Sequence, residues 1–202
     1  MKRIPFMLTA LLLLTSCKPL MLKMYQIKDP GVESKTSILK TAMRYGIDTS
    51  DILTVRPEDF LATLSAQPMP DIAVFDNAGA YIEYRSTDTS CNSGLFDFIP
   101  ALHLEGNYKK TGKMNLQQEL NNLRDINGNI LSSPIEKADF YLLLYWSVWL
   151  GKLNKDHVQV WERLAKQNRH CTIKVLKVNL DIQEFWPPAA KEQLVQMMRK
   201  KK

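Results

Sequence analysis

The sequence predicts an α/β protein in which one sheet carries helices on both faces. Two patterns indicate this class. In the last third, the apolar run Phe140–Trp146 and the alternating segment Thr172–Val178 flank a stretch with helical periodicity, which is typical of a parallel strand–helix–strand unit. In the first half, Ile72–Phe75 and Tyr81–Tyr84 flank an Asp-Asn-Ala-Gly turn, which predicts an antiparallel hairpin. We therefore expect a mostly parallel sheet with one antiparallel hairpin.

The first half of the chain alternates predicted strands and helices. Alternation over Met21–Ile27 predicts a strand, which Asp-Pro-Gly ends. Apolar residues recur at helical spacing over 38–43, and Gly46 is expected to cap the C-terminus of that helix. The apolar run Ile52–Val55 predicts a second strand. Pro57, which two acidic residues follow, is expected to lie in the first turn of a second helix.

The middle of the chain is more polar. A short helix is expected at about 93–101, and the glycine-containing segment 103–114 is expected to be a connector. Leucines at helical spacing over 116–123 predict a helix of two turns. Asn154 can cap the helix of the strand–helix–strand unit, and Pro187–Pro188 opens a last helix with one apolar face.

The composition excludes several classes of protein. The 202 residues are 45% hydrophobic and 24% charged, as in a globular protein rather than a disordered one. Three cysteines are too few for a disulfide scaffold, and the three histidines are not clustered, so we expect no metal site and no cofactor. The formal net charge of +6 comes without a recognition motif, so nucleic acid is not an expected partner.

The first seventeen residues have the pattern of an export signal. Met1–Arg3 is basic, and the apolar run Ile4–Leu14 is shorter than the about 20 residues that a membrane span needs. The four residues Leu-Thr-Ser-Cys that end at Cys17 resemble the bacterial lipobox. This resemblance implies cleavage after residue 16 and attachment of lipid to Cys17. The alternative is an ordinary cleaved signal, after which Cys17 has no role.

The expected organisation follows from this signal. We expect a signal peptide at 1–16, a lipidated tether at 17–20 and a single α/β domain at 21–202, which can be subdivided into 21–102 and 115–202. The protein would lie in the bacterial cell envelope, on its periplasmic or its surface side. The membrane would be a partner through the lipid.

The strand–helix–strand unit resembles the first such unit of the thioredoxin family. In that family an apolar strand runs into Phe-Trp and, after two residues, into Trp-Cys-Gly-Pro-Cys at the start of a helix. Here Tyr145 and Trp146 match Phe-Trp, Trp149 matches the second tryptophan, and Gly151 matches the glycine. The resemblance implies a thioredoxin-like sheet. The alternative is a generic strand–helix–strand unit whose tryptophans belong to the core.

The residues that carry thioredoxin chemistry are replaced. Leucine occupies both cysteine positions, at Leu150 and Leu153, and Lys152 stands where the proline would be. The buried acid of the family would fall at Leu144. Dithiol exchange needs one thiolate to attack and a second thiol to resolve the mixed disulfide. The resemblance therefore implies a thioredoxin-like domain that cannot exchange disulfides at this site.

A second resemblance lies in the first half. Met69-Pro70 and the hairpin behind it resemble the end of a thioredoxin fold, where a proline that is often cis opens the hairpin. Pro70 is thus a candidate cis-proline. Because this hairpin precedes the tryptophan strand, either the last third adds strands to the sheet of the first half, or the strand order of the fold is rearranged. The whole chain also resembles uncharacterised thioredoxin-like lipoproteins of Bacteroidetes-type bacteria.

Two cysteines would remain after lipidation. Cys91 precedes a predicted helix, whose dipole can lower the pKa of a thiol, and Cys171 begins a predicted strand. Three alternatives are open: a reactive Cys91, a static disulfide between Cys91 and Cys171, and two inert buried thiols.

The sequence accordingly predicts a membrane-anchored envelope lipoprotein that acts as a redox-inactive, thioredoxin-like binding module. Its partner would be a peptide or protein, and no residue is assigned a catalytic role. One alternative is an enzyme, a thiol oxidoreductase that uses Cys91. The other is a structural spacer of the envelope.

Overall fold

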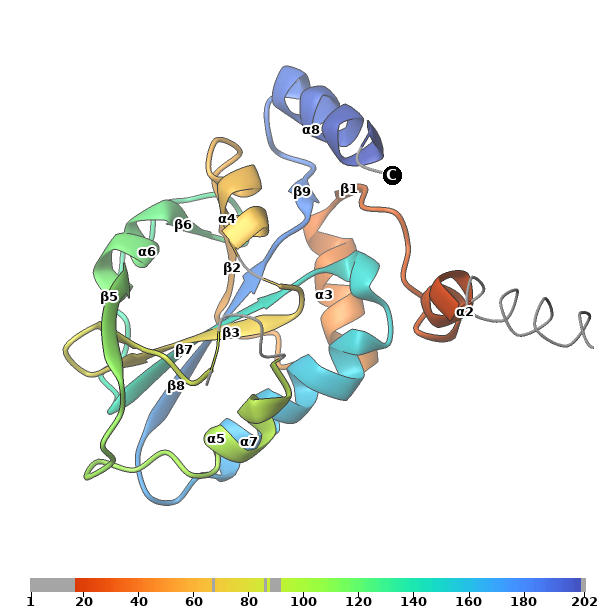
Figure 1. Cartoon of the computed structure of the whole chain (residues 1–202). Coiled ribbons are helices and arrows are strands. Elements are labelled where there is room, and N and C mark those ends of the chain that lie inside the picture. Colours follow the sequence, from red (N-terminus) through yellow and green to blue (C-terminus); the bar gives the residue numbers. More distant parts are fainter. Residues whose placement is uncertain (1–16, 67, 86, 88–91, 201–202) are drawn as a thin grey trace, which may run out of the picture.

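A seven-stranded sheet forms the centre of the protein. The computed structural model describes residues 17–66, 68–85, 87 and 92–200. The strands of the sheet are β2 (Ile52–Val55), β3 (Asp71–Asp76), β4 (Ala80–Ile82), β5 (Lys110–Asn115), β6 (Leu123–Asp125), β7 (Phe140–Trp146) and β8 (Ile173–Asn179). They lie in the order β5-β4-β3-β7-β8-β2-β6 (Figure 1). The short strands β1 (Val32–Glu33) and β9 (Ile182–Gln183) form a separate parallel pair.

Helices cover both faces of this sheet, as predicted. On one face lie α3 (Lys35–Tyr45), α5 (Leu95–Phe98) and α7 (Val160–Gln167), and on the other lie α4 (Phe60–Ala66), α6 (Leu116–Asn122) and α8 (Pro188–Lys200). Each layer packs on its own apolar core. Helix α2 (Cys17–Met24) stands apart at the edge of the domain (Figure 1).

Strand β7 separates the two cores. All seven of its residues are buried, which explains why its sequence is apolar throughout instead of alternating. Because side chains alternate along a strand, Leu142, Leu144 and Trp146 enter the core beneath α3 and α7. Leu143 and Tyr145 enter the opposite core. The sequence pattern of this strand therefore reflects burial on both faces.

Both patterns that predicted the fold class are confirmed. β7 and β8 are parallel neighbours along their whole length, from Phe140 opposite Ile173 to Trp146 opposite Asn179. β3 and β4 form the antiparallel hairpin, and Gly79 closes its turn at a φ of 81°. Strands from the first half and the last third are thus neighbours, since β3 pairs with β7.

The expected balance of parallel and antiparallel pairs is wrong. In the described part of the sheet two pairings are parallel, β7 with β8 and β2 with β8, and four are antiparallel. One reason is the segment expected to be a connector, 103–114, which contributes the edge strand β5. Most of the residues of β5 are exposed, so an apolar pattern that would announce a strand is missing.

The strand predicted at 21–27 is also wrong. Residues up to Met24 belong to helix α2, and the Tyr25 N–H still donates to the Met21 carbonyl at 3.0 Å. Short apolar segments fit both periodicities, so alternation over a few residues does not separate strand from helix. Among the described residues, no helix is both long enough and apolar enough to cross a membrane.

Candidate functional site

The region in which the sequence resembles the dithiol motif begins where β7 ends. We call residues 147–153 the motif loop. Ser147 continues the extended chain, Val148–Leu150 make one 3-10 turn, and Gly151 turns the chain at a φ of 57° and a ψ of −128°. The π-helical turn Asn154–Gln159 then leads into α7. Turns of this kind occur often at functional sites.

The two leucines of the motif serve packing. Leu150 is buried and Leu153 is half-buried, whereas Lys152 between them is exposed. Trp146 is buried in the core beneath α7, and Trp149 is half-buried. Neither leucine can supply a nucleophile or a proton.

The motif loop contacts the chain's own N-terminal segment. We call residues 25–28, which follow α2, the linker. The Lys28 N–H donates to the Trp149 carbonyl at 2.9 Å, and the Lys152 N–H donates to the Tyr25 carbonyl at 2.7 Å. Between these bonds, a Cβ atom on Gly151 would lie 2.3 Å from the Tyr25 carbonyl oxygen. Only glycine fits this close approach of two backbones.

A buried carboxylate holds the motif loop from below. Asp181, just after β8, is fully buried and accepts three hydrogen bonds. Ser147 Oγ donates to its Oδ1 at 2.6 Å, and the Val148 N–H and Asn179 Nδ2 each donate to its Oδ2 at 2.7 Å. These bonds fix the first turn after β7.

The same network reaches the helix start and the separate strand pair. Asn154 Nδ2 donates to the Ser147 carbonyl at 2.9 Å, and Gln183 Nε2 donates to Asn179 Oδ1 at 2.9 Å. Sequence reasoning missed this network. Its one signal is the alternation of polar residues at positions 179, 181 and 183, which begins at the last residue of a buried strand, at the same sheet edge as the end of β7.

Burial raises the pKa of Asp181 from 3.8 to about 6, against the lowering effect of the hydrogen bonds from Ser147, Val148 and Asn179. The folded state therefore binds this proton more tightly than the unfolded state. The protonated Asp181 therefore stabilises the folded protein. This stabilisation is fully present below about pH 4, and it is lost as the pH rises to about 6.

We expect Asp181→Asn to remove this loss. An amide keeps an acceptor for the Val148 N–H, and Ser147 Oγ can accept from it because it also bonds the Leu180 carbonyl. Urea unfolding from pH 4 to pH 8 should show the wild type losing up to roughly 3 kcal/mol relative to the variant. Parallel pH profiles of the two proteins would contradict the assignment.

A second buried carboxylate, which is paired with an arginine, lies beside the motif loop on the strand next to β7. The Met69–Pro70 peptide bond is cis, and Asp71 behind it lies opposite Tyr145. The Arg85 guanidinium and the Tyr84 hydroxyl, the latter at 2.8 Å, both donate to the Asp71 carboxylate. Burial raises the pKa of Asp71, against the lowering effect of these two partners.

Several buried polar atoms near the motif loop have no hydrogen-bond partner in the described part of the chain. They are Trp146 Nε1, Trp149 Nε1, Asn154 Oδ1, His157 Nδ1 and Trp161 Nε1. The ring of His157 packs 5.3 Å from that of Trp161, and burial lowers the pKa of this histidine. Donors and acceptors of this kind can bind water or a ligand.

Of the three cysteines, the structure describes the side chain of Cys171 alone. Cys17 is the first residue of α2, and its side chain lies outside the description, as does the whole of Cys91. Cys171 is half-buried and its thiol donates to the Leu102 carbonyl at 3.3 Å. Burial, with a smaller effect of Asp139, raises the pKa of Cys171 to about 11, so it carries little thiolate at neutral pH.

The chemistry open to the motif loop is that of its backbone. Its two hydrogen bonds to the linker use the main-chain atoms of Trp149 and Lys152 and no side chain of the motif loop. Among the described residues, no group of three histidine, cysteine, aspartate or glutamate side chains is placed to hold a metal ion.

No known protein family, curated protein or solved structure matches this chain.

Proposed function

We propose that the chain is a membrane-anchored module of the bacterial envelope, thioredoxin-like in fold but without a dithiol, which works by binding a peptide or protein. The lipobox-like sequence that ends at Cys17 supports the anchor. The sheet order supports the fold, because β8 and β7 of the first resemblance lie directly beside β3 and β4 of the second. In this interpretation the strand order along the chain is rearranged.

One observation carries the binding role. The motif loop holds the linker, a turn of the chain in which Gln26 has a φ of 55°, through backbone bonds at Trp149 and Lys152. A partner that takes up these two bonds replaces the linker. A surface that pairs with main chain in this way recognises peptides with little dependence on their side chains.

Thiol exchange assays separate this proposal from the enzyme alternative. We expect the purified wild type to reduce no protein disulfide, whereas Leu150→Cys/Leu153→Cys should form a disulfide within the loop and gain exchange activity. Leu150→Cys alone is the control, because a single thiol cannot resolve a mixed disulfide. Wild-type activity that Cys91→Ser abolishes would overturn the proposal in favour of an oxidoreductase.

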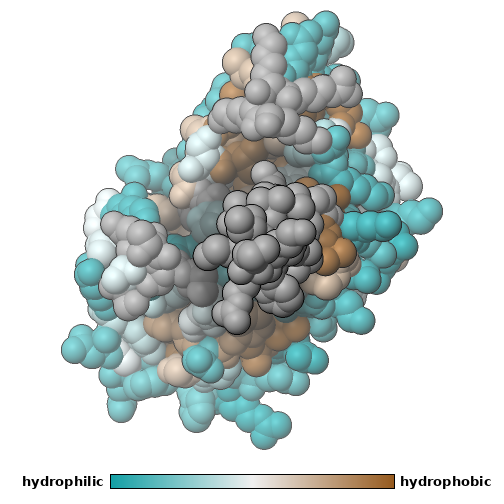
Figure 2. All heavy atoms as spheres, turned by 45° about the vertical axis from the view of Figure 1, so that its right-hand side comes forward, coloured by the Kyte–Doolittle hydropathy of each residue, from teal (hydrophilic) through white to brown (hydrophobic). Residues whose placement is uncertain are grey.

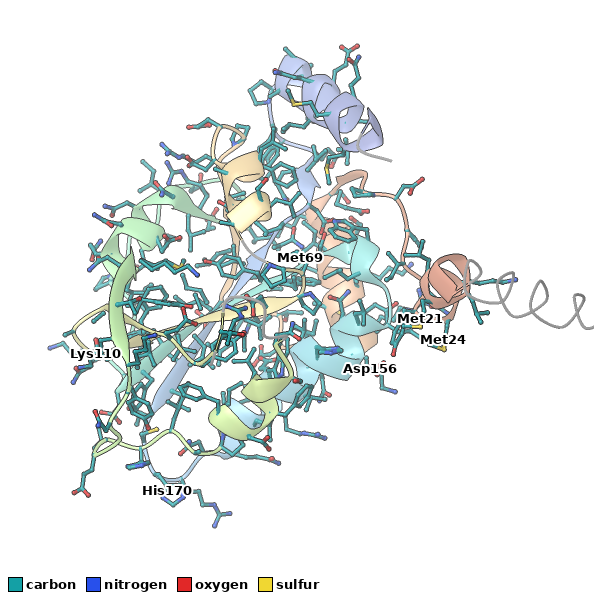
Figure 3. The ribbon with its side chains drawn as sticks, in the orientation of Figure 1. Met21, Met24, Met69, Lys110, Asp156 and His170 are labelled. Atoms are coloured by element: carbon teal, nitrogen blue, oxygen red, sulfur yellow. The ribbon has the colours of Figure 1, made fainter. Side chains whose placement is uncertain are left out.

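Site-specific photo-cross-linking in intact cells tests the binding role itself. Asp156, exposed beside the motif loop, and His170, exposed at the opposite end of β8, are the two positions for the cross-linker (Figure 3). We expect a discrete adduct with one peptide or protein from position 156 and none from 170. The same adducts, or no adducts, from both positions would favour the spacer.

A further inference from the structure

Helix α2 exposes more apolar side chain than any other short segment in the described part of the protein. Leu20, Met21, Leu22 and Met24 are 66%, 47%, 39% and 52% exposed. They are four of the ten large hydrophobic side chains that are exposed among the described residues. Soluble domains usually expose such residues singly. A cluster of four within five positions therefore indicates a partner surface.

The arrangement of these side chains indicates what kind of surface this is. Successive residues of a helix are turned by about 100°, so Leu20 and Met24 share one side while Met21 and Leu22 point to others. A helix that docks on a protein groove has one apolar stripe. The four apolar side chains of α2 together cover more than half of the circumference, and Lys23 lies on the remaining side, which is typical of a helix at a membrane interface. Figure 2 brings this side of the molecule forward and shows brown, hydrophobic residues on it.

We propose that α2 lies in the phospholipid surface of the membrane that anchors the chain. This inference rests on the proposed function, since the helix begins at Cys17, the residue that the lipobox assigns to the lipid. At 1.5 Å per residue the helix is about 12 Å long, which suits the boundary between headgroups and acyl chains. Lys23 and Lys28 are exposed at its end and just after it, where they meet anionic headgroups.

The linker connects the position of α2 at the membrane to the position of the rest of the domain. Because the Tyr25 carbonyl and the Lys28 N–H are bonded to the motif loop, α2 does not lie on a free tether. Immersion of α2 therefore places the motif loop at the membrane surface. The binding surface then faces partners that are themselves in or on that membrane.

Fluorescence quenching by labelled lipids tests the proposal. The lipidated full chain, with Cys91→Ser and Cys171→Ser, receives a single environment-sensitive probe through Met21→Cys or, as the matched control, Met43→Cys. Met43 is 65% exposed on α3 and Met21 extends from α2 at the edge of the domain (Figure 3). Each protein is reconstituted in vesicles of phosphatidylethanolamine and phosphatidylglycerol that carry a spin label high on the acyl chain.

We expect a blue shift and strong quenching of the probe at position 21, and neither at position 43. Vesicle flotation with equal, weak quenching at both positions would overturn the α2 contact and leave the lipid anchor intact. Failure of the protein to float with vesicles would instead contradict the proposed function. A blue shift without quenching, together with a doubled mass in detergent, would mean that a second copy of the chain covers α2 and would also overturn the proposal.

Discussion

Gly151→Ala is expected to detach the linker and to destabilise the folded protein by about 2 to 3 kcal/mol. A Cβ at this position would lie 2.3 Å and 2.4 Å from the carbonyl oxygens of Tyr25 and Gln26, which are backbone atoms and cannot rotate away. The backbone of Gly151, at a φ of 57° and a ψ of −128°, is also strained for any residue with a side chain. Urea unfolding measures the loss, and trypsin cleavage after Lys23 and Lys28 should become faster.

Gly31→Ala is the matched control. Gly31 follows the linker, and a Cβ there would have no neighbour within 4 Å. We expect its unfolding curve and its trypsin digestion to match those of the wild type. If Gly151→Ala were as stable and as resistant as Gly31→Ala, the close contact between the linker and the motif loop would be refuted.

Glu162→Gln is expected to cost about 3 kcal/mol of folding free energy. Glu162 on α7 and Lys177 on β8 are both buried, with 3.3 Å between Oε1 and Nζ. Glutamine keeps the shape and can still accept the Asp48 N–H, which now donates to Oε2 at 3.0 Å. The variant therefore leaves the Lys177 ammonium buried without the carboxylate that contacts it, and chemical unfolding at pH 7 measures the cost.

Two further variants separate burial of charge from loss of a surface pair. Glu162→Gln/Lys177→Met removes both charges and should recover most of the lost stability, because no unpaired ion remains. Asp48→Asn breaks the largely exposed ion pair between Asp48 and Lys166, which is 2.7 Å long. It should cost less than about 1 kcal/mol, because Lys166 Nζ keeps its contact with Glu162 Oε1 at 3.1 Å. Equal losses for Glu162→Gln and Asp48→Asn would show that the buried pair contributes no more than a surface pair.

The sequence predicted those elements whose burial produces a recognisable pattern of apolar residues. β7 is apolar throughout because both faces of the sheet are covered there, and Gly46 ends α3 in the left-handed conformation expected of it. β5 escaped prediction because most of its side chains are exposed. Helix α2 was mistaken for a strand because its exposed residues carry no helical stripe.

The candidate site was predicted only in its outline. The motif residues identified the end of β7, and the structure places Trp149, Leu150, Gly151 and Lys152 there in one loop. The Asp181 network and the docked linker were not foreseen. Both depend on residues that are far apart in the sequence, at 25–28, 147–154 and 179–183, and single-sequence patterns carry no information about such pairing.

The central claim is that the motif loop holds the chain's own linker through two backbone hydrogen bonds, at Trp149 and Lys152. Amide hydrogen exchange of the lipidated wild type tests this most directly, at the two donors Lys28 and Lys152. We predict that both amides exchange slowly and to a similar extent, because each closes one of the two bonds between the linker and the loop. Fast exchange at Lys28 and Lys152, with α7 and β8 still protected, would contradict the claim.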